Sequence, residues 1–226
     1  MPEIGRADDI AALIVEAAND SDHGLFDGDV VVVTQKIVSK AEGAMVEIDP
    51  TNPFSHKPIV ERESVRILRR RGDLIISQTK HGFVCANAGI DLSNVARGQA
   101  ALLPEDSDRS ARRIRDRLRG AHGLDVAVIV SDTFGRPWRR GVTDVAIGCA
   151  GIGAILDLRG TSDALGRELM VTEVCIVDEL AAAADLVCGK SSGVPVAIIR
   201  GVDATWFRTS GVVDEVVRPP GEDLFR

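Results

Sequence analysis

A carboxylate and a hydroxyl group at the end of an apolar run are the side chains of this sequence best suited to chemistry. Asp132 and Thr133 follow residues 126–130, a β-branched run typical of a buried strand. Side chains at the carboxyl end of such a strand face the crevice where α/β proteins bind ligands. Their oxygens suit Mg²⁺ or Mn²⁺, which complete their coordination with phosphate oxygens and water. The alternative is a capped loop in which both side chains only bond nearby backbone N–H groups.

Three arginines, Arg136, Arg139 and Arg140, follow within the same segment. A planar guanidinium group forms paired hydrogen bonds with phosphate and stays charged at any relevant pH. We therefore expect these arginines to face the phosphate groups that a metal at Asp132 would hold. Solvated arginines on a surface loop are the alternative.

A second acidic position has a similar character. Asp91 and Asn94 lie in a polar turn that follows a weakly alternating apolar segment. Asp91 is a candidate second metal ligand, and the alternative is an Asx turn in which both side chains bond nearby backbone groups. A third segment, residues 28–43, predicts a strand that runs into a pattern of Lys36, Ser39 and Lys40.

Taken together, four segments in this order identify a family resemblance. Residues 28–43, 88–95, 126–148 and 171–200 resemble the ligases that add γ-linked glutamates to the deazaflavin coenzyme F420. The likeness is to the archaeal single-domain form and to the amino-terminal half of the two-domain actinobacterial form. It covers nearly the whole chain.

The resemblance implies a set of site residues. One or two divalent ions, Mg²⁺ or Mn²⁺, would be held by Asp91, Asp132 and Thr133, and K⁺ is a further cation that the family allows. GTP, the co-substrate, would contact the amino-terminal turn, the segment that follows the first strand, and the polar turn that holds Asp91. The residues at those positions are Pro2, Glu3, Ile4, Gln35, Lys40 and Asn94. Gln35 replaces the serine usual in the family, and its amide can still donate and accept hydrogen bonds.

Both ends of the chain also match family features. Met1 stands where the family has leucine in the amino-terminal turn, and relatives carry a further strand ahead of it. We therefore expect a shortened amino terminus, with an exposed edge and loss of stability. Residues 218–226 resemble the connector that leads to a nitroreductase-like domain in the two-domain form.

The expected fold class is α+β, with mixed sheets, packed helices and an intertwined two-lobed arrangement, in a single domain over residues 1–226. Strands are predicted at residues 30–33, 126–130, 168–177 and 195–201, and a helix from about Asp178 to a stop at Gly189. The arginine-rich segments 66–71 and 112–119 both resemble amphipathic helices, with apolar side chains on the buried stripe.

Composition excludes several classes of function. The net charge of −7 and pI of about 5.2 argue against nucleic acid as a partner. No signal peptide or apolar stretch of membrane-spanning length occurs, so we expect a cytoplasmic protein without membrane contact. The four cysteines form no CxxC pair and are interpreted as buried thiols rather than zinc ligands. Among the histidines, only His81 lies near a candidate site in the sequence.

The family resemblance implies an enzyme that condenses L-glutamate with the lactyl carboxylate of the coenzyme precursor F420-0 while GTP is hydrolysed to GDP and phosphate. An acyl phosphate would activate the carboxylate, and a homodimer is expected from the resemblance. The alternatives are a nucleotide- or metal-binding regulatory module and a different ATP-dependent amide ligase. No GxxxxGK[ST] loop supports a P-loop enzyme.

Overall fold

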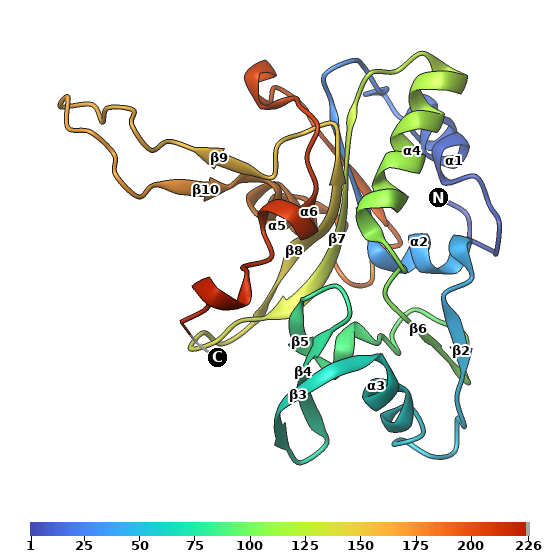
Figure 1. Ribbon diagram of the computed structural model, residues 1–226. Coiled ribbons are helices and arrows are strands. Elements are labelled where there is room, and N and C mark those ends of the chain that lie inside the picture. The colour runs from blue at the N-terminus through green and yellow to red at the C-terminus, as the bar shows by residue number, and fades with distance from the viewer. Residues whose placement is uncertain (225–226) are drawn as a thin grey trace.

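The computed structural model describes residues 1–224, and its centre is a four-stranded mixed sheet (Figure 1). β1 runs parallel to β7, and β8 and β11 lie antiparallel on the two sides. The residues that β1 and β7 share as partners, from Val30 with Ala127 to Val33 with Val130, are buried, as expected for a strand covered on both faces. In spatial order the strands are β11 (Val196–Ile199), β1 (Val30–Thr34), β7 (Ala127–Gly135) and β8 (Val142–Ala150).

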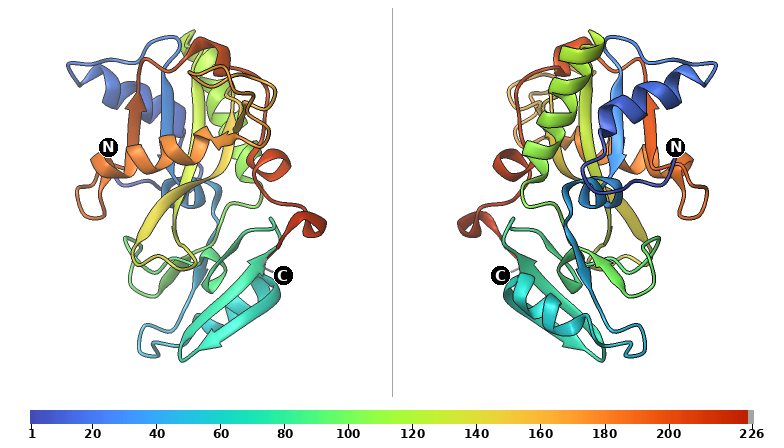
Figure 2. Two further views of the ribbon diagram at one scale, coloured as in Figure 1. Left: turned by 90° about the vertical axis from the view of Figure 1, so that its left-hand side faces the viewer. Right: turned by 90° about the vertical axis from the view of Figure 1, so that its right-hand side faces the viewer.

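Helices cover both faces of this sheet, as the two views in Figure 2 show. α4 (Ser107–His122) packs on one face with α1 (Ile10–Asn19) beside it, and α5 (Ile176–Cys188) packs on the other. The carboxylate of Asp106 accepts from the backbone N–H of Arg109 at the start of α4, and Gly123 ends the helix in the left-handed conformation. Apolar side chains from these helices complete the core.

A smaller set of elements, called the smaller unit below, is inserted in the chain between β1 and β7 and lies below the main sheet in Figure 1. α2 (Gln35–Glu42) leads from β1 into it. It contains a three-stranded antiparallel sheet with one helix, and a separate pair of short strands. These elements are β2 (Met45–Glu47), α3 (Lys57–Glu63), β3 (Ser64–Arg71), β4 (Leu74–Thr79), β5 (Val84–Ala86), the 3₁₀ turn η1 (Asn87–Gly89) and β6 (Gln99–Ala101).

A two-stranded arm projects from the main body on the left of Figure 1. It consists of β9 (Ile155–Asp157), β10 (Glu173–Cys175) and the long connection between them. The remaining elements are the 3₁₀ turn η2 (Ala204–Trp206), α6 (Val212–Glu215) and the 3₁₀ turn η3 (Pro220–Glu222). The architecture confirms the α+β class with mixed sheets and packed helices. Of the predicted connector 218–226, residues 225 and 226 lie outside the described residues.

Four predicted elements are confirmed in type. The strands at residues 30–33 and 126–130 are β1 and β7, and the strand at 195–201 is β11. The predicted carboxyl-terminal helix is α5, which ends at Cys188 with Gly189 as its cap. The predicted strand at 168–177 is shorter, since only Glu173–Cys175 pair with β9. In residues 1–224 no helix is long and apolar enough to cross a membrane.

The two arginine-rich segments behave differently. Residues 112–119 are helical as predicted, and Ala111, Ile114 and Leu118 of α4 are buried. The helix predicted at residues 66–71 is wrong, because this segment forms most of strand β3. It pairs with β4, in which Ile75, a core residue of the smaller unit, is buried. Strand pairing across the tight turn at Gly72 overrides the helical preference of the arginines.

Candidate functional site

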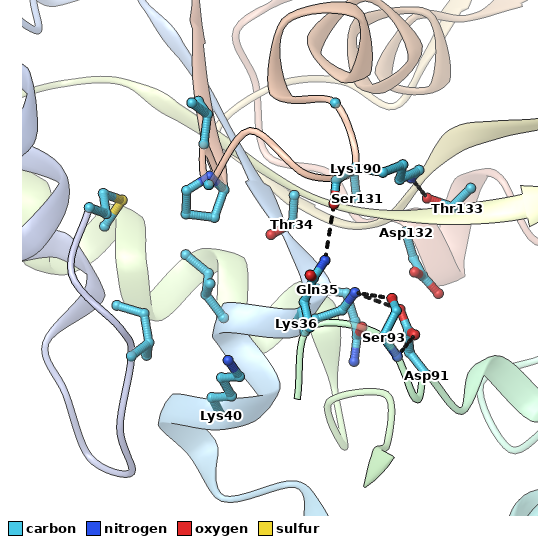
Figure 3. Close-up of a pocket in the computed structure, with 18 of the residues that line it drawn as sticks. Thr34, Gln35, Lys36, Lys40, Asp91, Ser93, Ser131, Asp132, Thr133 and Lys190 are labelled. Atoms are coloured by element: carbon cyan, nitrogen blue, oxygen red, sulfur yellow. Dashed lines mark hydrogen bonds and ion pairs between the residues drawn. The ribbon is translucent and has the colours of Figure 1, made fainter. Parts of the chain in front are cut away.

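A single cavity of about 520 Å³ is lined by all nine residues that the family resemblance implies for the metal and GTP. It lies where the carboxyl ends of β1 and β7 meet the amino terminus and the smaller unit (Figure 3). Since the two strands are parallel, their carboxyl ends open on the same side of the sheet. The predicted residues that line the cavity are Pro2, Glu3, Ile4, Gln35, Lys40, Asp91, Asn94, Asp132 and Thr133.

β7 contributes three successive residues to the cavity wall: Ser131, Asp132 and Thr133. The strand was expected to end at Asp132, but it continues to Gly135 as one arm of a hairpin with β8. A register shift between Val130 and Ser131 interrupts the regular pairing immediately before these residues. Such bulges bend a strand and redirect its side chains, which accounts for consecutive residues reaching one cavity.

A buried carboxylate on β8, Asp144, holds two of these hydroxyl groups. Thr133 Oγ1 donates to Asp144 Oδ1 at 2.6 Å, and Ser131 Oγ donates to Asp144 Oδ2 at 3.0 Å. Because each hydroxyl gives its proton to Asp144, its lone pairs remain available to accept from, or coordinate, a cation in the cavity. Asp144 itself is only 4% exposed.

Asp132 is the most perturbed acid of the site. Burial raises the pKa of its carboxyl group to about 7, and repulsion from Asp91 and Asp144 adds to the rise. A hydrogen bond from the backbone N–H of Thr133 and the charge of Lys36 oppose it in part. The Asp132 side chain extends toward the part of the cavity that holds Asp91 (Figure 3). A carboxyl group whose pKa is raised by neighbouring carboxylates lies at a position that favours a cation.

Asp91 is paired with a lysine from α2. Lys36 Nζ lies 2.7 Å from Asp91 Oδ2 and donates to Ser93 Oγ at 3.0 Å. Burial alone would raise the pKa of Asp91, but the hydrogen bonds from Lys36 and Ser93, together with the Lys36 charge, hold it below its ordinary value. Asp91 therefore remains ionised. The Ser93 N–H also donates to Asp91 Oδ1 at 2.7 Å, so the predicted Asx turn and the cavity-facing carboxylate occur together.

A glycine-bounded loop after α5 closes the opposite side of the cavity. Lys190 lies 3.4 Å from Asp144 Oδ1 and 3.5 Å from Asp185 Oδ1, and it donates to Thr133 Oγ1. Its carbonyl oxygen accepts from Asn94 Nδ2 at 3.2 Å. This bond joins the loop to the predicted nucleotide-contacting turn. Lysine side chains thus stand beside the acidic groups on both sides of the cavity.

α2 and the amino-terminal turn form the third wall. Lys40 was interpreted as a residue at a strand end, but it lies in the last turn of α2, where its ammonium group pairs with Glu3. The predicted nucleotide contact Gln35 is only 1% exposed, and its amide N–H groups donate to Ser39 Oγ and to the Leu102 carbonyl. The amide nitrogen of Gln35 is therefore committed to joining α2 to the segment after β6.

The donor set fits a hard divalent cation. Asp91, Asp132 and Thr133 offer only oxygen atoms, the ligand type that Mg²⁺ and Mn²⁺ prefer. Within residues 1–224, no group of three or more His, Cys, Asp or Glu side chains is arranged to hold a metal by itself. Two carboxylates and a hydroxyl suit an ion that takes its other ligands from phosphates and water, rather than a closed structural metal site.

The structure does not bring every candidate to the cavity. Arg136, Arg139 and Arg140 do not line it, because the hairpin carries them past its rim to an exposed tip. His81 Nε2 instead lies 2.9 Å from the Pro104 carbonyl oxygen, and its ring stacks on Phe83. The cysteines are free thiols as predicted. Cys85, Cys149 and Cys188 are buried and Cys175 is half-buried.

Several residues that line the cavity were missed in the sequence. Asp144 lies between ordinary strand residues and carries no local signal, since only the β7–β8 register places it beside Thr133. Lys190 had a signal that went unused, because residues 189–193 form a short polar loop bounded by glycines directly after a helix. Lys36 belongs to the lysine pattern of residues 28–43, but the sequence did not predict it as a site residue.

Comparison with known proteins adds an independent line of observation. Residues 1–201 match the model of the family described as F420-0:gamma-glutamyl ligase. A protein named coenzyme F420:L-glutamate ligase from Methanothermobacter thermautotrophicus is 46% identical, over 100% of this chain and 96% of its own length. Proteins of the same name from Methanopyrus kandleri and Methanocaldococcus jannaschii are 42% and 39% identical. Those alignments cover 99% and 88% of this chain, and 94% and 85% of the relatives.

Proposed function

This chain belongs to the F420-0:gamma-glutamyl ligase family, and from that premise we propose that it ligates L-glutamate to coenzyme F420-0 at the expense of GTP. The observation that carries the proposal is that the nine residues predicted for GTP and metal line one cavity. Near full-length similarity to relatives named coenzyme F420:L-glutamate ligase supports the choice of substrates. The chemistry of the cavity supports GTP and a divalent metal ion as the further participants.

The reaction requires activation of a carboxylate. We propose that the lactyl carboxylate oxygen of the precursor attacks the γ-phosphorus of GTP, which yields an acyl phosphate and GDP. The amine of glutamate then attacks the acyl carbon, phosphate leaves with the former carboxylate oxygen, and the nitrogen loses a proton to form the amide. No nucleophilic side chain is required, because the phosphoryl group itself supplies the leaving group.

The role of this chain is to bring anionic reactants together. Lys36 and Lys190, which neutralise Asp91 and Asp144 in the structure, lie where they can turn to incoming phosphate oxygens. Asp91, Asp132 and Thr133 would hold Mg²⁺ or Mn²⁺, whose charge lowers the repulsion between phosphate and carboxylate. Lys40 and the turn of residues 2–4 would contact the nucleotide, on the wall that α2 and the amino terminus form.

We also propose that the protein is a homodimer, with the β9–β10 arm in the interface. The arm extends away from the main body (Figure 1), and its connection presents exposed apolar side chains. Leu165 is 95% exposed, and Met170 and Val171 are also exposed. Apolar groups gathered on a projecting arm favour contact with another protein surface. We propose that this surface belongs to a second copy of the same chain.

The proposed activity is tested by incubating the protein with F420-0, L-glutamate, GTP and Mn²⁺ and measuring the product by mass spectrometry. The expected product is heavier than F420-0 by one glutamyl residue and forms with release of GDP. Product formed with ATP and not GTP would assign a different amide ligase. Nucleotide binding without any glutamate-dependent product would assign a regulatory module instead.

A further inference from the structure

The tip of the β7–β8 hairpin, residues 136–141, is a basic and aromatic surface that the cavity does not use. Trp138 is 83% exposed, and Arg136, Arg139 and Arg140 are exposed around it. Within residues 1–224 none of the three arginines forms an ion pair. The tip therefore carries three positive charges around a large aromatic ring that faces water.

The backbone of the tip holds this ring in an unusual conformation. Trp138 has a φ of 57°, in the left-handed region where glycine and asparagine are favoured and bulky residues are rare. Strained residues of this kind gather at ligand-binding sites, so the backbone of Trp138 marks the tip as a candidate binding surface.

The base of the hairpin is fixed, so the tip has a defined position relative to the cavity. Phe134 packs edge-on against Phe83 of the smaller unit, with ring centroids 6.1 Å apart. Phe83 is buried and stacks in turn on His81. One residue before Phe134, Thr133 lines the cavity and is bonded to Asp144. The tip and the cavity wall thus belong to one hairpin whose base is packed on the smaller unit.

The reach of the hairpin matches the proposed precursor. Trp138 lies five residues beyond Thr133, a separation of at most about 16 Å along an extended strand. In F420-0 the lactyl carboxylate and the planar deazaflavin ring are joined through a phosphodiester and a ribityl chain. About ten covalent bonds separate them, or roughly 12 Å when extended. With its carboxylate in the cavity, the precursor can reach the tip with its ring.

We propose that the hairpin tip is the recognition site for the deazaflavin and phosphodiester parts of the precursor. Trp138 stacks on the planar ring, and the flanking arginines pair with the phosphodiester. This inference rests on the proposed function, since it takes the carboxylate of F420-0 to lie in the cavity. It assigns to the basic loop a partner other than the GTP phosphates that its sequence suggested.

Steady-state kinetics of tip variants test the assignment. Trp138→Ala should raise the KM for F420-0 about tenfold or more, as expected for loss of one stacked ring. It should leave kcat and the KM for GTP and for glutamate unchanged. Trp138→Phe should retain most of the affinity for F420-0. Arg139→Gln should raise the KM for F420-0, and the difference from wild type should be smaller at high salt concentration. Arg71→Gln, at an exposed arginine of β3 outside the cavity, is the matched control.

A substrate fragment separates stacking from a general disturbance of the loop. As a competitive inhibitor, 2-phospholactate keeps the phosphate and the carboxylate but has no ring. Its Ki should be unchanged in Trp138→Ala and raised in Arg139→Gln. An unchanged KM for F420-0 in both variants overturns the assignment. So does a rise in the Ki of 2-phospholactate in Trp138→Ala that equals the rise in the KM for F420-0. A variant that changes the oligomeric state but not the KM also overturns it.

Direct binding keeps this inference distinct from the proposed function. Precursor binding is followed by quenching of tryptophan fluorescence in Trp206→Phe, in which Trp138 is the remaining tryptophan of the sequence. Saturable quenching by F420-0 supports the tip even where no product forms. If Trp206→Phe still ligates glutamate but F420-0 does not quench its fluorescence, the result contradicts the assignment of the tip and leaves the proposed function intact.

Discussion

Thr133 and Asp144 are directly paired across the β7–β8 hairpin, and the threonine hydroxyl donates to the buried carboxylate at 2.6 Å. The same carboxylate accepts from Ser131 and lies 3.4 Å from Lys190. Asp144 therefore fixes three groups that face the cavity, although it contributes little surface of its own. We interpret it as a positioning residue.

Asp144→Asn should lower kcat by about 10- to 100-fold, the effect typical of losing a residue that orients a ligand. The apparent affinity for Mn²⁺ should fall as well, because Thr133 loses its oriented proton acceptor. Metal titration of activity measures both effects. A variant with a lower melting temperature but unchanged Mn²⁺ dependence would assign Asp144 to stability alone. Asp144→Glu, which keeps the charge, should retain more activity.

Asp132→Asn should abolish turnover while the fold stays intact. The amide keeps the size of the side chain but removes the charge that would bind the cation. Turnover at limiting Mn²⁺ and circular dichroism of the apo protein are the two measurements. Near-normal activity at limiting metal would show that Asp132 only caps the strand and that the metal site lies elsewhere.

The raised pKa of Asp132 also predicts a pH dependence of stability without metal. The folded-state pKa of about 7 lies above the value near 3.9 in unfolded chains, so the folded protein binds the extra proton between these values. Stability should therefore fall as pH rises from about 4 to 7, by at most about 4 kcal/mol for this group. Asp132→Asn should remove that slope, as urea unfolding at several pH values would reveal. Equal slopes in both proteins would contradict the assignment of this pKa.

Lys40→Ala should weaken GDP binding by about tenfold, as expected for loss of a charge-assisted hydrogen bond to phosphate. The KM for glutamate should stay the same. Calorimetric titration with GDP and Mn²⁺ measures the effect, with Lys80→Ala at an exposed lysine outside the cavity as control. Equal affinity for GDP in wild type and variant would show that Lys40 only pairs with Glu3 and does not contact the nucleotide.

An ion pair between a buried carboxylate and a half-exposed arginine, away from the cavity, predicts an effect on stability. Arg200, which directly follows β11, donates two hydrogen bonds of 2.8 Å to Asp29, which is 1% exposed. Burial alone would raise the pKa of Asp29, but the Arg200 and Phe26 hydrogen bonds lower it below its ordinary value. Arg200→Ala should cost about 3 kcal/mol, because it leaves a buried charge unpaired.

The sign of its pH dependence follows from the same pair. A depressed folded-state pKa gives stability that is present above the unfolded pKa of about 3.9 and is lost as pH falls through the folded value. The difference in unfolding free energy between wild type and Arg200→Ala should therefore shrink below about pH 4. A difference that stays constant from pH 7 to pH 3 would attribute the loss to packing on Phe26, whose ring lies 4.5 Å from the guanidinium carbon.

The sequence was sufficient for elements whose pattern and burial agree. β1 and β7 are runs of β-branched residues in the centre of a sheet, and α4 has an apolar stripe among charged residues. The segment 66–71 misled, because an exposed strand of a small sheet has no buried face strong enough to show alternation. Its pairing with β4 is a tertiary fact that local preference does not contain.

The site divides in the same way. Asp91 lies in a recognisable polar turn, and Asp132 and Thr133 directly follow an apolar run. Family resemblance selected them from equally ordinary alternatives. Asp144 and Lys190 come from distant parts of the chain, and they join the site only through strand register and a loop that follows α5. The arginines of residues 136–140 were recognised as basic, but the length of the hairpin that carries them past the cavity was not predicted.

In the proposed reaction, the carboxylate of F420-0 is activated in this cavity by a phosphoryl group from GTP. The most direct measurement uses F420-0 labelled with ¹⁸O in its lactyl carboxylate, and mass spectrometry of the released phosphate. We expect one ¹⁸O atom to appear in inorganic phosphate for each amide formed, and none to be released by Asp132→Asn. Amide product accompanied by phosphate that contains no ¹⁸O would contradict it.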